Sequence, residues 1–222
     1  MRSNKRLGQN FLSDKRILAK ILEAGEISPS DVVLEVGPGK GSLTELLAPR
    51  AKKVIAVEKD ARLAAWLKEH KTWKNVEIIS GDILKNPTPY ALIPTPYKVV
   101  ANIPYYITSR FLKTFLTAKH KPKIMALMVQ YEVAKRITAR PGEMNLLALS
   151  VQIFGKPKII AKVPRRYFRP RPKVDSAIIK ISDISDKWLK TNGLSEDEFF
   201  FFLKKAFQQK RKMLSRSLGI KN

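Results

Sequence analysis

The feature that most constrains this chain is an alternation of short apolar, β-branched runs with segments of helical periodicity. Five runs are typical of buried strands, namely residues 32–36, 54–58, 76–79, 98–103 and 124–129. Apolar residues recur at helical spacing in the segments 43–51, 61–70, 108–117 and 145–154. Strands that alternate with helices form a parallel sheet covered on both faces. The pattern therefore predicts an α/β fold.

The last third of the chain departs from this alternation. Residues 159–163 and 177–181 are two further apolar runs with no helical segment between them, which predicts an antiparallel hairpin at one edge of a seven-stranded sheet. Residues 156–173 contain four prolines and are predicted to be a loop. Residues 195–218 are predicted to be helical. We expect a main domain over residues 1–182 and a small helical C-terminal domain over 183–222.

Composition excludes several classes of protein. The 222 residues include no cysteine and two histidines, so disulfide scaffolds, thiol catalysis and Cys- or His-based metal sites are not expected. No run approaches the roughly 18 apolar residues of a membrane span. The basic N-terminus has no apolar segment behind it and does not resemble a secretory signal.

Positive charge is concentrated at the two ends of the chain. The formal net charge is +24, yet residues 21–109 carry 11 basic and 10 acidic side chains. Residues 156–180 hold nine basic side chains and one acidic, and the last twenty residues hold seven basic and none acidic. Such segregation predicts a polyanionic partner and indicates a nucleic acid. A solvated lysine-rich surface and an anionic membrane surface are the alternatives, and no basic amphipathic helix with an exposed aromatic face supports the membrane.

A glycine-rich turn joins the first predicted strand to the helical segment behind it. Gly37, Gly39 and Gly41 allow a sharp turn and close approach of a ligand to the backbone. Their spacing differs from the Gly-x-Gly-x-x-Gly of dinucleotide sites, and no Gly-Lys-Ser/Thr follows, so a P-loop is excluded.

Acidic residues end the next two strands. Glu58 stands 21 residues after Gly37, where a carboxylate accepts hydrogen bonds from both hydroxyls of a ribose. Asp82 ends the third strand and is placed to accept a hydrogen bond from an adenine amine. Each alone could be an ordinary strand-end or turn residue. Together with the glycine turn they predict a site for an adenosine-type ligand.

A polar loop ends the fourth strand. Asn102 is followed by Ile-Pro and by two tyrosines. The Asn102 side-chain oxygen and a carbonyl before or at Pro104 could accept both N–H bonds of an exocyclic amine. Tyr105 offers a flat face for stacking. Two accepted hydrogen bonds would direct the nitrogen lone pair toward an electrophilic methyl group, with no histidine or cysteine required.

These segments together resemble the KsgA/Dim-type small-subunit rRNA adenine dimethyltransferases, with the Erm macrolide-resistance methyltransferases as close relatives. The resemblance extends from Lys5 to about Leu218. It is carried by ordered motifs over residues 5–12, 35–44, 57–58, 81–84, 102–107, 128–134, 168–177 and 206–214.

The resemblance implies a class I S-adenosylmethionine-dependent methyltransferase: a Rossmann-like, mostly parallel seven-stranded sheet with an antiparallel edge hairpin and a small helical C-terminal domain. The implied reaction is four methyl transfers, two to N6 of each of two adjacent adenines near the 3′ end of 16S rRNA in the small ribosomal particle. The residues implied at the cofactor site are Asn10, Leu12, Gly37, Gly39, Glu58, Lys59, Asp82, Ile83 and Asn102. Those implied at the target base are Asn102, Pro104, Tyr105 and Phe168, the last closing over the base.

The basic segments supply the candidate RNA contacts. We expect phosphate contacts from Arg165, Arg166, Arg169, Arg171, Lys210, Arg211 and Lys212. Tyr106 departs from the family, whose members commonly carry a smaller polar residue there. The chain also stops soon after residue 214, where relatives continue through further helices.

Three alternatives remain open. An Erm-type enzyme would act on naked 23S rRNA, but residues 208–212 resemble the small-subunit family better. A ribosome-assembly factor without catalysis would be expected to have lost Gly37, Glu58 or Asn102. A nicotinamide dehydrogenase is disfavoured by the glycine spacing. We expect a protein of the bacterial cytoplasm, because a motif that begins at Lys5 leaves no room for a transit peptide. We expect a monomer, since nothing in the sequence suggests a dimer interface. Neither a metal nor a membrane is expected as partner.

Overall fold

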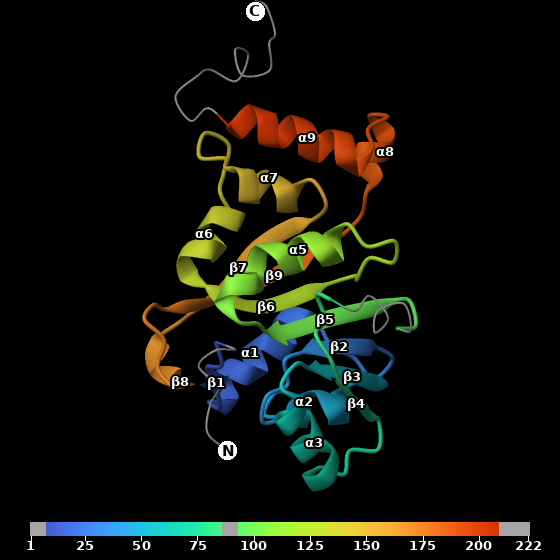
Figure 1. Cartoon of the computed structure of the whole chain (residues 1–222), viewed down its shortest axis with the longest axis vertical. Coiled ribbons are helices and arrows are strands. Elements are labelled where there is room, and N and C mark those ends of the chain that lie inside the picture. The colour runs from blue at the N-terminus through green and yellow to red at the C-terminus, as the bar shows by residue number, and fades with distance from the viewer. Residues whose placement is uncertain (1–7, 86–92, 209–222) are drawn as a thin grey trace, which may run out of the picture.

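The computed structural model describes residues 8–85 and 93–208 and is built around one seven-stranded sheet (Figure 1). The strand order is β4-β3-β2-β5-β6-β9-β7. The first five strands are parallel, and β9 pairs antiparallel with both β6 and β7. The predicted parallel sheet with an antiparallel edge hairpin is therefore confirmed. The strands are β2 (Val32–Val36), β3 (Lys53–Glu58), β4 (Val76–Ser80), β5 (Tyr97–Asn102), β6 (Met125–Gln130), β7 (Lys156–Val163) and β9 (Ser176–Ser182).

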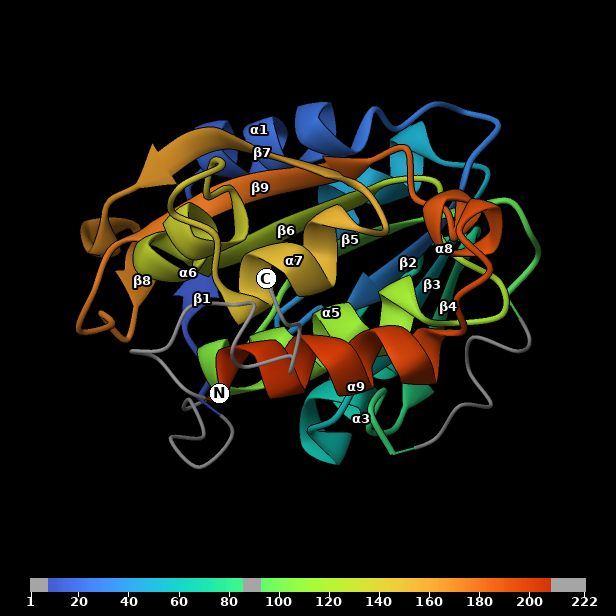
Figure 2. The same ribbon diagram turned by 90° about the horizontal axis from the view of Figure 1, so that it is seen from above.

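Helices cover the two faces of the sheet unequally. Helix α1 lies on one side, and α5, α7 and α9 lie on the other (Figure 2). Adjacent strand residues point to opposite faces, so that Val33 belongs to the core under α1 and Leu34 to the core under α5. The helices are α1 (Lys15–Gly25), α2 (Thr44–Leu47), α3 (Ala61–His70), α5 (Thr108–Leu116), α6 (Tyr131–Ile137), α7 (Leu146–Gln152), α8 (Lys187–Thr191) and α9 (Glu196–Phe207), with 3₁₀ turns η2 (Ala48–Arg50), η3 (Tyr105–Ile107) and η4 (Arg165–Tyr167).

The structure refines one prediction about local structure and corrects another, and a proline is involved in each. The segment 43–51 is a single turn of α-helix followed by the 3₁₀ turn η2, because Pro49 has no N–H for an α-helical hydrogen bond. The segment 156–173, expected to be a loop, begins with the eight-residue strand β7, which contains the strand predicted over residues 159–163. Pro157 is tolerated there because β7 is the edge strand of the sheet, where an N–H need not be donated.

A second, two-stranded sheet was not predicted. Strand β1 (Phe11–Leu12) pairs antiparallel with β8 (Phe168–Arg169), and these segments lie more than 150 residues apart in the sequence. Leu12 and Phe168 face each other in the register and are both buried in the core under α1. Strands of two residues carry no periodicity, so the sequence held no local signal for them.

The C-terminal helices pack on the main sheet through α7. Ser195 and Glu198 form a capping box that begins α9. The ring of Phe200 in α9 stacks on the ring of Phe154, which is fully buried. Leu203, also in α9, is buried as well. The helix was predicted to extend from residue 195 to residue 218, and the part of it beyond residue 208 lies outside the described residues. A domain boundary at residue 182 stays a prediction.

No helix in the described part of the chain is long and apolar enough to cross a membrane.

Candidate active site

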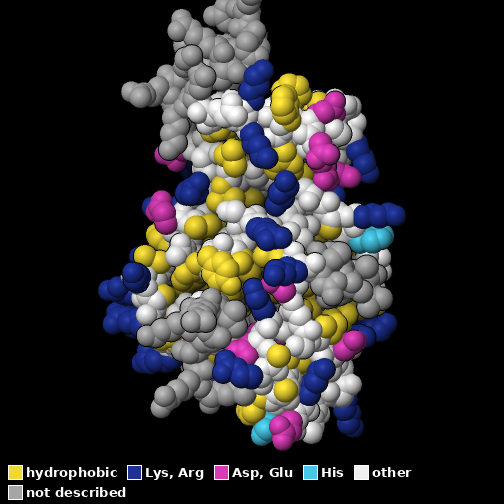
Figure 3. All heavy atoms as spheres, viewed as in Figure 1, with side chains coloured by type: hydrophobic (Ala, Val, Ile, Leu, Met, Phe, Trp, Pro, Cys, Tyr) yellow, Lys and Arg dark blue, Asp and Glu magenta, His cyan; other side chains and the backbone are white. Residues whose placement is uncertain are grey.

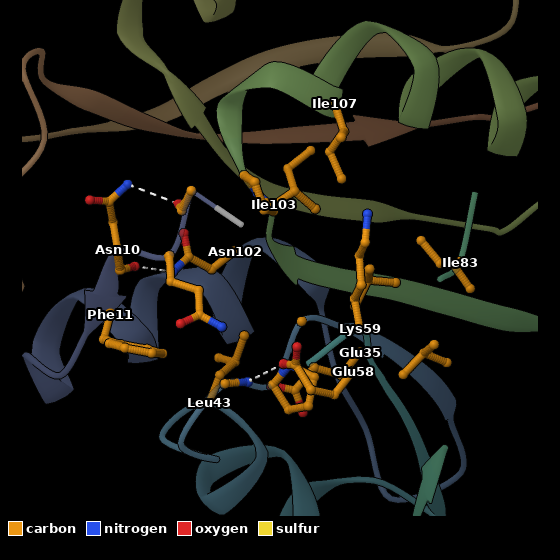
Figure 4. A pocket seen from close by; sticks show the side chains of 18 of the residues that line it. Asn10, Phe11, Glu35, Leu43, Glu58, Lys59, Ile83, Asn102, Ile103 and Ile107 are labelled. Carbon is orange, nitrogen blue, oxygen red and sulfur yellow. Dashed lines mark hydrogen bonds between the residues drawn. The ribbon is translucent and has the colours of Figure 1, made fainter. Parts of the chain in front are cut away.

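A pocket opens at the carboxyl ends of the parallel strands. Its volume is about 340 Å³. Residues 8–12 and the glycine-rich turn lie on one side of it, and the ends of β3, β4 and β5 supply the rest. In Figure 4, Asn10 and Phe11 lie on one side, Ile83 on the other, and Glu58 between them. Ligands of open α/β sheets bind at this edge, so the position agrees with the one predicted.

The glycine turn follows β2 directly, and a backbone hydrogen bond connects it to β3. Gly37 N–H donates to the Val57 carbonyl at 2.9 Å. Gly37 and Gly39 have φ angles of +73° and +60°, which L-residues with side chains seldom adopt. A Cβ at Gly39 would lie 3.1 Å from a ring carbon of Phe11. Glycine is therefore required both for the turn and for the approach of Phe11.

Glu58 is the carboxylate at the centre of the pocket floor. Its oxygens accept from the backbone N–H of Gly39 at 2.9 Å and of Asp60 at 2.8 Å. Burial raises the pKa of Glu58, although these two N–H groups oppose the rise. A carboxylate has about four acceptor positions, so Glu58 retains capacity for hydroxyl donors from the pocket. Its geometry suits a ribose diol.

Asp82 is held in place at the end of β4. The Lys59 ammonium lies 3.0 Å from one oxygen, and the Leu84 N–H donates to the other at 3.1 Å. Burial acts to raise the pKa of Asp82, but Lys59 and Leu84 outweigh it and the pKa is lowered. Ile83, the next residue in the sequence, is buried and lines the pocket. An anionic acceptor beside an apolar wall suits the edge and face of an adenine ring.

The Asn102 loop forms the opposite rim. The Asn102 side-chain N–H donates to the Asn10 carbonyl at 3.3 Å, which leaves the amide oxygen as an acceptor. The Tyr105 hydroxyl hydrogen bonds to Ser176 of β9 at 2.6 Å, so the ring is fixed to the sheet. Burial raises the pKa of Tyr105, and Ser176 partly opposes this. Of the two backbone carbonyls that the sequence indicated, the one of Pro104 already accepts from Ile107 N–H at 3.2 Å.

Residues 8–12 connect the two halves of the site. Gln9 donates to Asp60 at 3.2 Å beside the glycine turn, and Phe11 packs on Gly39. Gly8 lies against Pro104 and Tyr106 of the Asn102 loop. The same short segment therefore contacts the glycine turn and the Asn102 loop.

Glu35 is a site residue that the sequence analysis missed. It ends β2 beneath the pocket, with 1% of its surface exposed, and neither carboxylate oxygen has a hydrogen-bond partner among the described residues. Burial raises its pKa to about 8; the nearby Thr44 acts to lower the pKa, and the charge of Glu58 adds to the rise. An acidic residue within an otherwise apolar strand was the available signal.

The structure gathers most of the predicted site residues but not all of them. The side chain of Phe168 is fully buried in the core beside Leu12 and does not line the pocket, which differs from the expected position over a base. Arg165, Arg166, Arg169 and Arg171 are exposed on the connection that contains η4 and β8. Lys210, Arg211 and Lys212 lie outside the described residues. The predicted residues that line the pocket are Asn10, Leu12, Gly37, Gly39, Glu58, Lys59, Asp82, Ile83, Asn102, Pro104 and Tyr105.

Comparison with known proteins identifies the family. The sequence model described as "Ribosomal RNA adenine dimethylase" matches residues 1–221. The chain belongs to the ribosomal RNA adenine dimethylase family. A relative from Dehalococcoides mccartyi (strain CBDB1), named ribosomal RNA small subunit methyltransferase A, is 47% identical over 99% of this chain and 75% of its own. The predicted family is confirmed.

Solved structures give the same answer for the fold of this dimethylase. A dimethyladenosine transferase from Plasmodium falciparum superimposes with a TM-score of 0.81 and 34% identity, over 93% of this chain and 74% of that one. The 23S rRNA methyltransferase ErmE superimposes with a TM-score of 0.79 and 32% identity, over 96% of this chain and 84% of that one. The class I methyltransferase fold is thus confirmed. Overall shape hardly distinguishes the two types of enzyme.

Proposed function

We propose that the protein transfers methyl groups from S-adenosylmethionine to N6 of two adjacent adenines in the 3′-terminal hairpin loop of 16S rRNA, within the small ribosomal particle. The observation that carries this proposal is one pocket with two kinds of polar wall. Glu58 and Asp82 form the wall suited to an adenosine, and Asn102 with Tyr105 forms the wall suited to an amine on a planar base. The names of the relatives support the choice of the small subunit.

The chain's own residues fit S-adenosylmethionine. The free acceptor positions of Glu58 suit its ribose hydroxyls, and Asp82 with Ile83 suits its adenine. The missing side chains at Gly37 and Gly39 let its amino-acid end approach the backbone. When bound, it would supply an electrophilic methyl group on a sulfonium for transfer to N6, and the N6 proton displaced by that transfer would pass to water.

The Asn102 loop would orient the target amine. The amide oxygen of Asn102 accepts one N6–H, and a loop carbonyl accepts the other, which leaves the lone pair directed along the line to the methyl carbon. Tyr105, anchored to Ser176, presents its ring to the base. Catalysis by such a site rests on positioning and orientation. The base must leave its stack to enter the pocket, as in other base-modifying enzymes.

One observation favours a second candidate. The near-equal superposition on ErmE makes a 23S rRNA adenine methyltransferase the alternative substrate assignment. The chemistry at Asn102 would be the same in both, so the site alone does not select the RNA.

The experiment measures methyl transfer from labelled S-adenosylmethionine to undermethylated small-subunit particles, naked 23S rRNA and tRNA, with the modified nucleotide mapped. We expect dimethyladenine in the small-subunit particle. We expect Asn102→Ala to lower kcat about 100-fold or more, the scale of losing an oriented polar group at the reacting atoms. Methylation of 23S rRNA alone would support the alternative assignment as a 23S rRNA adenine methyltransferase. Full activity of the Asn102→Ala variant would show that Asn102 has no role in the mechanism.

A further inference from the structure

Tyr106 is an exposed aromatic ring at the mouth of the pocket. It is 63% exposed and lines the pocket beside Tyr105. One side of its ring lies against Gly8, where an added Cβ would come within 3.3 Å of a ring carbon. The exposed ring presents a flat surface at the mouth of the pocket.

Cationic side chains continue from this ring along α5. Arg110 stands four residues after Tyr106, also lines the pocket, and donates to the Leu84 carbonyl at 3.3 Å. Lys113 follows at i+3 on the exposed face of α5, and its ammonium lies 4.8 Å from the centroid of the Phe200 ring of α9. Figure 3 shows Lys and Arg side chains in a column over α9 and α5. The column leads from the pocket mouth to the C-terminal helix, which Lys113 contacts at Phe200.

These two cations have no anionic partner in the part of the chain that the structure describes. All 19 Asp and Glu residues of the chain lie within the described ranges, and none of them forms an ion pair with Arg110 or Lys113. Lys59, by contrast, is neutralised by Asp82 within the pocket. The charge of the column is therefore available to a ligand, and an exposed aromatic ring beside unpaired cations is the composition that binds single-stranded nucleic acid.

We propose that Tyr106, Arg110 and Lys113 form a binding track for the RNA strand that flanks the target adenine. The inference rests on the proposed function and extends it. Tyr106 stacks on the base next to the one in the pocket, and Arg110 and Lys113 contact the phosphates that follow it toward α9. A base stacked on Tyr106 would hold the strand open while the target adenine is in the pocket.

The test measures RNA affinity and methyl transfer for three variants of the full chain. Tyr106→Ala should weaken RNA binding about tenfold, the scale of one stacked base, and raise KM for RNA more than it lowers kcat. Tyr106→Phe keeps the ring and should recover most of that loss. Arg110→Ala/Lys113→Ala should reduce the slope of log affinity against log salt by about 1.4, because each phosphate contact on a single strand contributes about 0.7.

The matched control is Lys119→Ala/Lys123→Ala. It removes the same charge from exposed lysines between α5 and β6 that form no ion pair among the described residues. It should leave the affinity within about twofold of that of the unmodified protein and the salt slope unchanged. The affinity of each variant for S-adenosylmethionine, measured without RNA, shows whether the pocket is intact.

Three results would overturn the track. These are a Tyr106→Ala variant that binds RNA normally, a double variant whose salt slope equals that of its control, and a Tyr106→Phe variant as weak as Tyr106→Ala. Failure of the proposed function is a separate result, in which the unmodified protein methylates none of the three RNA acceptors.

Discussion

A single buried carboxyl group differs from every other acid in this protein. Glu35 lies beneath the glycine turn with no hydrogen-bond partner among the described residues, whereas Glu58, which is also buried, accepts from two backbone N–H groups. The pKa of Glu35 rises to about 8, chiefly because burial disfavours its charged form. The site therefore contains one carboxyl group that is protonated at neutral pH.

Glu35→Gln should change how stability depends on pH. The folded pKa of about 8 exceeds the ordinary value of 4.5, so the folded state holds a proton that the unfolded state releases. The contribution of this proton is fully present below pH 4.5 and is lost as the pH rises to 8. Relative to Glu35→Gln, we expect the wild-type free energy of unfolding to fall by up to about 1.4 kcal/mol per pH unit in that window. Urea unfolding of both proteins between pH 5 and 9 measures it.

The comparison is internal, since the groups other than Glu58, whose charge acts on Glu35, are expected to titrate alike in the two proteins. Above pH 8 the difference should level off, because Glu35 is then ionised in both states. Parallel stability curves between pH 5 and 8 would show that the carboxyl group has an ordinary pKa and is better hydrated than its burial indicates.

Among the elements, those with local periodicity were predictable and those formed by distant pairing were not. Helix α3 occupies the predicted residues 61–70, because Leu63 and Leu67 lie on one face and Asp60 caps its start. Strand β7 was predicted over residues 159–163, but its first three residues were not, because Pro157 and the neighbouring lysines give this edge strand a loop-like composition.

The site residues also divide into those that local sequence predicts and those that depend on distant pairing. Residues at strand ends, such as Glu58 and Asn102, were found because parallel strands bring their carboxyl ends to one edge. Phe168 was placed by resemblance alone. Its burial depends on the pairing of β1 with β8, which no local pattern indicates.

Phe168 offers a test of the β1–β8 sheet. Because its ring is fully buried beside Leu12, Phe168→Ala should destabilise the protein by about 3–5 kcal/mol, the usual cost of such a cavity. Phe168→Leu fills most of the space and should cost less than about 1.5 kcal/mol. Urea unfolding measures both, and methyl transfer is assayed on the leucine variant. If that variant is stable but inactive, the ring acts on the base after a movement of this sheet.

At the scale of the whole molecule, the positive charge divides into two regions around the pocket. Arg110 and Lys113 lie on the α5 side, and the four arginines of residues 165–171 are exposed next to β8. Strand β8 pairs with β1, whose Phe11 contacts the glycine turn. An RNA loop that reached both regions would span the mouth of the pocket, so that phosphate contacts on each side fix the base between them.

The arginine region should account for much of the salt dependence of RNA binding. Replacing all four arginines by glutamine should reduce the slope of log affinity against log salt by about 2 to 3, at about 0.7 per phosphate contact on a single strand. Affinity for S-adenosylmethionine should not change, since none of the four lines the pocket. The control removes four exposed lysines that form no ion pair among the described residues, namely Lys52, Lys68, Lys74 and Lys119. Equal slopes for the two quadruple variants would mean that total charge, and not its position beside β8, governs the attraction to RNA.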